Sequence, residues 1–440
     1  MLTSTGSAAT AVMTSPDAPA KKVVWDKRLS AIFWVNSVAI SNDGRRVVAA
    51  TYLHDYNQKT GKGLPNVKSK FGTFCLDGAP AEDGASKNPL WSNEYDAWDG
   101  VFGVAISGDG TIAAASGFRD LTPETTVGIA PIPEGATNQG LVRAYDATNG
   151  TKLLDCSSIG QRVSWVSLSH DGKVLAAVAD DVYVFLRDRG NFNPVPVKLG
   201  IRDVAKEFVT NVALHPDGTW LVACDKIGHV YVARIDARTG VITSQATWTA
   251  DAEYPFLSVA IAARTNTVAV GGGNVVFHFG FNANGTLRDP IRIDTTIGSD
   301  PATIPPNKSD GKLQENVRWV ATSADGTLVT AVANRMNEKT FTGVLMALTP
   351  EATQLRKLWT VPLDSNPNST SIDGAGQFIA VADGFPTGKP AKFHLFEADG
   401  TKLWDFTTYS MNWPIVISAS GNAIAAGSDD GTVYYFTPRG

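Results

Sequence analysis

The chain is poor in cysteine and in charged residues, and both shortages exclude classes of function. Among its 440 residues there are three cysteines, none in a CxxC pair, so no zinc or redox motif is present. We expect Cys75, Cys156 and Cys224 to be small buried side chains. Charged residues make up 18%, with 38 basic against 43 acidic residues and a net charge of −5. This balance argues against a nucleic-acid-binding surface, which is normally basic.

Long apolar runs and a targeting signal are also lacking. No stretch approaches the roughly 18 consecutive apolar residues of a membrane span, so none is predicted. Residues 1–20 are rich in Ser, Thr, Ala and Pro and lack the basic region and apolar core of a signal peptide. We interpret them as a disordered leader. A cytoplasmic location is therefore expected, or a periplasmic or secreted one if an upstream signal has been removed.

Glycine (41) and proline (23) are abundant, and an internal repeat explains many of them. Each copy has an alternating apolar strand, a Ser-x-Asp-Gly turn or a variant of it, and a second strand rich in Val and Ala. Asp-Gly favours a tight β-hairpin, since Gly adopts positive φ and Asp bonds its own backbone. The clear turns are 41–44, 107–110, 169–172, 215–218 and 323–326. Two degenerate copies keep Gly376 and Gly421, and the copy at 258–270 has lost Asp-Gly.

The spacing of the copies and the two ends of the chain predict the fold. The copies are spaced by roughly 45 to 66 residues, the period of four-stranded propeller blades. The last copy has only three strands, and residues 21–27 supply a candidate fourth, because KVVWD at 22–26 resembles KLWD at 402–405. We predict an all-β fold: an eight-bladed β-propeller of four-stranded antiparallel blades, one domain over 21–440, closed by its N-terminal strand. Seven blades remain the alternative if the fifth copy is not a blade.

The third-to-fourth strand connections carry a further pattern, close to Ala-x-Asp-x-x-x-Gly, and several fourth strands contain Leu-Trp. The connections are 144–150, 234–240 and 397–404, and the pairs are Leu90-Trp91, Leu358-Trp359 and Leu403-Trp404. This pattern resembles the tryptophan-docking repeat of the quinoprotein (PQQ-like) propeller superfamily, which implies an eight-bladed propeller over nearly the whole chain. WD40-like propellers are the competing assignment, although no Gly-His…Trp-Asp signature recurs.

The resemblance implies the fold and not the chemistry of the quinoproteins. Quinoprotein dehydrogenases clasp their cofactor with an adjacent cysteine pair, and this chain has no Cys-Cys. No cofactor is predicted, and neither PQQ nor calcium is supported by a motif. Carboxylates that follow several second strands are candidates for calcium, but ordinary Asp turn chemistry is the favoured interpretation. They are Asp180, Asp181, Asp225, Asp383, Asp429 and Asp430.

One face of the predicted ring carries most of the insertions. Connections between second and third strands share this face with the connections between blades, and long loops on a rigid scaffold usually carry function. The insertions are 52–70, 119–139, 295–315, 335–342 and 384–392. The start of each first strand lines the channel mouth on the same face. The candidate binding residues are Trp34, Asn36, His54, Asp55, Trp98, Asp99, Arg119, Trp165, Arg318, Trp319, Arg335 and Trp413.

These residue types favour binding over catalysis. Arginine beside tryptophan predicts an anionic or planar ligand, held by ion pairing and stacking, unless the tryptophans pack between blades. His54 next to Asp55 has the chemistry of a general base or metal ligand but lacks a partner, and no catalytic residue is predicted. We predict a binding or scaffold protein that recognises a protein partner or small ligand through this face. The alternative is an enzyme (a quinone-dependent oxidoreductase, lyase or hydrolase) with its site at the channel mouth.

Overall fold

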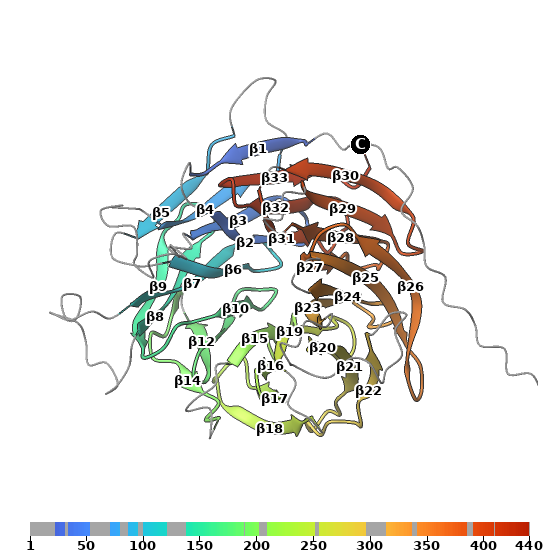
Figure 1. Cartoon of the computed structure of the whole chain (residues 1–440). Helices are drawn as coiled ribbons and strands as arrows, with labels where there is room; N and C mark the ends of the chain where they lie inside the picture. The colour runs from blue at the N-terminus through green and yellow to red at the C-terminus, as the bar shows by residue number, and fades with distance from the viewer. Residues whose placement is uncertain are drawn as a thin grey trace, which may run out of the picture.

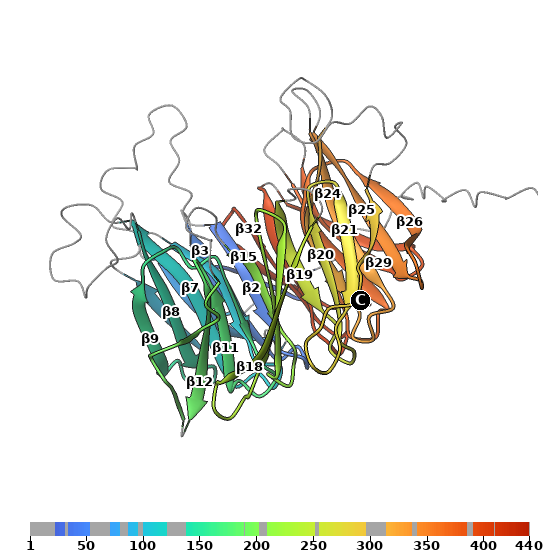
Figure 2. The same ribbon diagram turned by 90° about the horizontal axis from the view of Figure 1, so that it is seen from below.

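The computed structural model shows eight antiparallel sheets arranged as blades around a central channel (Figure 1). Figure 2 shows the same ring turned by 90°, with strands running through its thickness. The predicted eight-bladed β-propeller is confirmed, and no helix in the part described is long and apolar enough to cross a membrane. The structure describes residues 23–30, 34–52, 71–79, 87–95, 100–120, 138–188, 190–201, 209–250, 255–295, 314–336, 341–384, 390–408 and 410–439.

Blades one to four follow one another along the chain. Blade one contains β2 (Trp34–Ile40), β3 (Arg46–Tyr52), β4 (Phe71–Asp77) and β5 (Trp91–Tyr95). Blade two contains β6 (Gly100–Ile106), β7 (Ile112–Asp120), β8 (Asn138–Asp146) and β9 (Lys152–Ile159). Blade three contains β10 (Trp165–Leu168), β11 (Val174–Val178), β12 (Val182–Asp188) and two short outer strands, β13 (Asn191–Phe192) and β14 (Val197–Lys198). Blade four contains β15 (Val209–Leu214), β16 (Trp220–Asp225), β17 (His229–Ile235) and β18 (Ile242–Thr249).

Blades five to eight complete the ring. Blade five contains β19 (Phe256–Ile261), β20 (Thr267–Gly272), β21 (Val275–Gly280) and β22 (Ile291–Asp294). Blade six contains β23 (Gln314–Thr322), β24 (Val329–Met336), β25 (Phe341–Pro350) and β26 (Leu355–Leu363). Blade seven contains β27 (Pro367–Ile372), β28 (Phe378–Asp383), β29 (Ala391–Glu397) and β30 (Lys402–Thr408). Blade eight contains β31 (Asn412–Ile417), β32 (Ile424–Ser428), β33 (Thr432–Phe436) and β1 (Trp25–Arg28).

The N-terminal strand closes the ring, as predicted. β1 pairs antiparallel with β33, with Trp25 opposite Tyr435 (Figure 1). The two aromatic rings stack with their centroids 4.9 Å apart and an interplanar angle of 6°. Trp25 is only 4% exposed, so its indole fills the joint between blades eight and one. The predicted leader at 1–20 lies outside the described residues.

Apolar packing between blades supplies the core of the molecule. The buried hydrophobic residues that the structure describes fall into eight clusters, one at each junction between neighbouring blades. All three cysteines are buried and free, as expected. Three fourth-strand tryptophans also dock onto the following blade, each donating its indole N–H to a carbonyl oxygen. Trp91 bonds Ala147 at 2.9 Å, Trp359 bonds Ala398 at 2.8 Å, and Trp404 bonds Pro438 at 3.0 Å.

The Ser-x-Asp-Gly turns have the geometry that the residue types predict. In blade three, the Ser169 hydroxyl donates to Asp171 at 2.9 Å and accepts the backbone N–H groups of Lys173 and Val174 at 3.1 and 3.0 Å. Gly172 has φ of 61°, in the region that L-residues rarely adopt. Blade five forms its hairpin without Asp-Gly, because Ala262 N–H still bonds the carbonyl oxygen of Thr267 at 3.0 Å.

Backbone hydrogen bonds join these turns into a belt around one face of the ring, which we call the turn face. In seven of the eight blades, a residue of the turn donates its N–H to the turn of the next blade. The donors are Asn42, Asp109, His170, Arg264, Ala324, Gly374 and Ser420, and the last of these closes the belt onto Asn42 of blade one. The donor is the second residue of the turn in four blades and the third in the other three. In blade four the second residue, Pro216, has no N–H, and the N–H of the third, Asp217, is directed to His215 Nδ1 at 3.5 Å. The belt is therefore interrupted between blades four and five.

Candidate functional site

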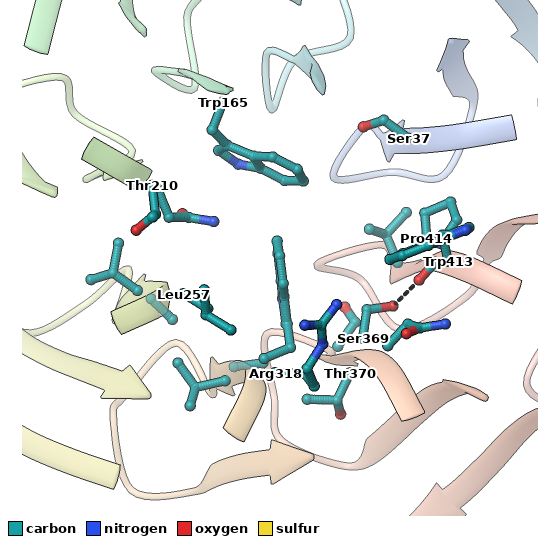
Figure 3. A pocket seen from close by; sticks show the side chains of 18 of the residues that line it. Ser37, Trp165, Thr210, Leu257, Arg318, Ser369, Thr370, Trp413 and Pro414 are labelled. Carbon is teal, nitrogen blue, oxygen red and sulfur yellow. Dashed lines mark hydrogen bonds between the residues drawn. The ribbon is translucent and has the colours of Figure 1, made fainter. Parts of the chain in front are cut away.

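A cavity of about 810 Å³ lies in the central channel (Figure 3). First strands from all eight blades contribute to its wall: β2, β6, β10, β15, β19, β23, β27 and β31. Each first strand begins at the face opposite the turn face, which we call the mouth face. The volume falls within the range of ordinary ligand pockets.

Irregular strand pairing determines which side chains enter the cavity. Seven of the eight first strands carry a register shift against their second strands, and at each shift one or two residues are left without a partner. Such β-bulges re-aim side chains next to binding sites. The unpaired residues are Asn36, Phe102, Thr210, Leu257, Arg318, Asn368, Trp413 and Pro414. Every one of them lines the cavity.

Polar side chains on the wall mainly tie neighbouring blades together. The Asn36 amide donates to the Phe102 carbonyl oxygen at 3.1 Å, and the Asn368 amide donates to the Asn412 carbonyl oxygen at 2.6 Å. The Thr210 hydroxyl bonds the carbonyl oxygen of Phe256 in the next blade at 2.7 Å. Ser369 similarly bonds Trp413 (Figure 3). These donors hold the rim in place and are engaged before any ligand arrives.

Two tryptophans from distant blades meet within the channel. The ring centroids of Trp165 in blade three and Trp319 in blade six lie 5.1 Å apart at an angle of 60°, an edge-on contact. Each indole is also partly buried against the apolar cluster of its own blade junction. The alternative that tryptophans only wedge between blades therefore does not describe this pair, which also presents aromatic surface to the cavity.

Three positively charged side chains line the cavity, and no carboxylate does so among the described lining residues. Arg318 extends into the cavity from the bulge in β23 (Figure 3), and it makes no hydrogen bond or ion pair within the described part of the chain. Burial lowers the pKa of its guanidinium below the usual value. The guanidinium of Arg162 lies 3.9 Å from the ring centroid of Phe118 and 4.9 Å from that of Phe102, as a cation–π pair. Lys226 is the third cation.

The cavity brings together five of the twelve residues predicted from sequence. Asn36, Trp165, Arg318, Trp319 and Trp413 all line it. The others lie elsewhere or outside the described residues. Trp34 begins β2 without reaching the lining, Arg119 on β7 bonds Gln139 at 3.1 Å, and the backbone of Arg335 belongs to β24. The residues outside the described part are His54, Asp55, Trp98 and Asp99.

Sequence reasoning missed Arg162 and Lys226. Arg162 precedes β10 in a connection between blades, and Lys226 follows β16 in a second-to-third strand turn. Both connections belong to the mouth face. A search for cations in all short connections of that face, not only in the insertions, would have found them.

The recurring aspartates after second strands are saturated by local hydrogen bonds. Asp225 accepts bonds from the backbone of Ile227 and His229, from His229 Nδ1 at 2.8 Å and from the Tyr231 hydroxyl at 2.7 Å. Asp383 binds Lys392 N–H and His394 Nε2 in the same way. No group of three or more His, Cys, Asp or Glu side chains suited to a metal ion occurs among the described residues. These carboxylates form turns, which agrees with the favoured interpretation.

Asp429 departs from this pattern. It lies in the turn between β32 and β33, and its buried Oδ1 has no hydrogen-bond partner. Burial raises the pKa of this carboxyl group to about 8, and neighbouring Asp430 adds to the rise. The indole N–H of Trp413 lies close to it, and partly lowers that pKa, without forming a hydrogen bond of good geometry. Near neutral pH, Asp429 is therefore largely uncharged and does not offset the cations of the cavity.

The ring, its inter-blade cores and its central cavity define the class of protein: an eight-bladed β-propeller. The family described as "WD domain, G-beta repeat" matches residues 203–231, a stretch that includes β15 and β16 of blade four. This is the competing assignment named above, whereas the resemblance to the quinoprotein repeat is not shown by the comparisons and stays a prediction. No curated protein matches the chain by sequence.

Solved structures with the same architecture include Sqt1 propellers from two organisms. Sqt1 from Chaetomium thermophilum superposes with a TM-score of 0.61 at 14% identity, covering 94% of this chain and 98% of that one. Its complex with the N-terminus of the ribosomal protein L10 gives a TM-score of 0.60 at 15% identity, with 94% and 99% covered. Saccharomyces cerevisiae Sqt1 gives 0.60 at 12% identity, with 98% and 100% covered. At this identity the likeness shows the fold alone.

Proposed function

We propose that the chain is a binding scaffold that holds a segment of a protein partner at the mouth of its central channel. The observation that carries the proposal is the cavity wall, in which three cations and several aromatic side chains surround one opening. No histidine or carboxylate stands on the described wall to act as a general base. Binding chemistry therefore accounts for the residues that are present better than catalysis does.

The likeness to Sqt1 supports the same proposal. One of the similar structures contains a propeller bound to the N-terminus of a ribosomal protein, so a ring of this architecture can hold a protein segment. The partner itself does not transfer at this identity. A small-molecule ligand is the finer alternative for a cavity of about 810 Å³. Native mass spectrometry of the purified chain would reveal such a ligand as an added mass.

Site-specific photo-crosslinking tests the proposal. A benzophenone amino acid in place of Leu257, on the cavity wall, should crosslink a partner in cells that express the full chain. The matched control carries the same group in place of Val241, which is 57% exposed in the connection between β17 and β18 on the turn face. We expect an adduct from position 257 only, and the purified partner should then form a complex with the wild-type chain. Equal crosslinking from both positions, or none from 257, would show that the channel mouth is not the binding surface.

A further inference from the structure

The charge of the cavity is opposite to that of the chain. The chain carries a net charge of −5, whereas the described cavity wall carries three positive charges and no negative one. Clefts lined by one sign of charge concentrate ligands of the other sign, because the low-dielectric walls focus the field. The sign of the wall therefore restricts the chemistry of what enters it.

Among the three cations, Arg318 gives the most direct indication of an anionic ligand. Its side chain extends into the cavity, yet no described residue accepts a hydrogen bond from it or pairs with it. Its neighbours Asn368 and Ser369 donate to carbonyl oxygens of blade eight. Burial removes part of the hydration of this guanidinium, and no described protein group supplies an acceptor in its place. A carboxylate is the natural complement, since its two oxygens match the planar fork of the guanidinium.

The positive charge of Lys226 is not neutralised by the neighbouring Asp225. The Asp225 carboxylate is fully engaged by His229, Tyr231 and two backbone N–H groups, and no ion pair links it to Lys226. Arg162 covers the faces of Phe102 and Phe118, which do not neutralise its charge. All three cations of the described wall are therefore available to an anionic group.

Apolar surface flanks these charges and adds a second requirement. The edge-on pair of Trp165 and Trp319 lines the same cavity as Arg318. Figure 3 shows Trp165, Leu257 and Arg318 around it. A ligand that fills the site must then carry apolar or aromatic groups close to its negative charge. Aspartate and glutamate interleaved with phenylalanine or leucine meet both requirements.

We propose that the partner segment is an acidic peptide, with one carboxylate on Arg318 and an apolar side chain against the Trp165–Trp319 pair. This inference rests on the proposed function and deepens it, since it adds the chemistry of the segment. The same carboxylate chemistry could come from a free small acid, so the experiment includes one.

Three fluorescent peptides of equal length and the same Phe and Leu positions test the inference on the full chain. One carries Asp and Glu, one the corresponding Asn and Gln, and one Lys. We expect the acidic peptide to bind on the order of tenfold more tightly than the amide peptide. Added salt should weaken it. N-acetylglutamate should displace it poorly, and displacement at concentrations equal to those of the peptide would overturn the peptide as the source of the carboxylate.

Variants locate the binding. Arg318→Gln should lose the preference for the acidic peptide, whereas Arg238→Gln, an exposed residue on the turn face, should keep it. Lys226→Gln provides a second cavity variant if Arg318→Gln does not fold. Equal binding of the amide or lysine peptide, or an unchanged preference in the cavity variants, would overturn the inference. If the peptide test fails but position 257 crosslinks a partner, only the acidic character of the segment is wrong. If position 257 crosslinks no partner, the scaffold proposal itself is wrong.

Discussion

The two faces of the ring differ in how closely their blades repeat one another. On the turn face, the same Ser, Asp and Gly contacts recur from blade to blade, and backbone hydrogen bonds join successive turns. On the mouth face, bulged first strands place a different side chain in the channel in nearly every blade. The repeated face holds the blades together, while the varied face supplies the residues that distinguish this ring from another. Substitutions on the two faces should accordingly have different consequences.

The largest loss of stability should come from the junction of blades eight and one, on which both faces depend. Trp25→Ala removes the buried indole that stacks on Tyr435 and leaves a cavity where blade eight meets blade one. We expect the free energy of unfolding to fall by about 3–5 kcal/mol, measured by denaturant titration. Val241→Ala, at an exposed site, is the control and should change it little. A loss no greater than that of the control would contradict closure by the N-terminal strand.

A smaller loss of stability is expected on the turn face. Ser169→Ala deletes the hydroxyl that accepts the N–H groups of Lys173 and Val174. Lys173 keeps its bond to Asp171 Oδ1 at 3.1 Å, whereas the buried N–H of Val174 loses this acceptor. The free energy of unfolding should fall by about 1–3 kcal/mol, because an unsatisfied buried donor keeps its desolvation cost. Ser92→Ala, at an exposed position on β5, serves as the control in the same titration. Similar stabilities of the two variants would mean that the serine hydroxyl does not stabilise the hairpin turn.

On the mouth face we expect a gain of stability, and its size should depend on pH. The pKa of Asp429 is about 8 in the folded chain and 3.8 as its ordinary value. A raised pKa of an acid stabilises the folded state below the ordinary value, and this stabilisation is lost as pH rises through the folded value. Asp429→Asn stays uncharged, so it should be more stable than the wild type near pH 9 and lose this advantage towards pH 4. Denaturant titrations from pH 4 to pH 9 measure the free energy of unfolding of both proteins. If it changes with pH by the same amount in the two proteins, the assigned pKa is wrong.

Much of the fold could be predicted because its determinants are local. Asp-Gly sets the hairpin within four residues, as at 169–172, and the spacing of such turns defines the blade. Closure was predictable from the similarity of 22–26 to 402–405. The tryptophans of the two stretches, Trp25 and Trp404, are both buried, and they lie on the outer strands β1 and β30. Blade five formed without the turn motif because strand pairing fixes its register, so the missing Asp-Gly was no sign of a missing blade.

The cavity was harder to predict because its determinants are not local. The contact between Trp165 and Trp319 depends on the diameter of the ring and on two blades far apart in the chain. The bulges break the period-two alternation, so the pattern of side chains does not reveal which residue of a first strand enters the channel. Arg162 and Lys226 lie in short connections, where sequence reasoning had directed attention to long insertions.

The interruption of the belt at Pro216 has a consequence for how the ring comes apart. A closed ring can open either within blade eight, where β1 pairs with β33, or between two neighbouring blades. Seven junctions resist the second route with apolar packing and a turn-to-turn hydrogen bond, whereas the junction of blades four and five lacks that bond. We expect the ring to open there into an arc whose two end blades expose their packing faces. Pro216 therefore marks the junction between two blades that we expect to separate first.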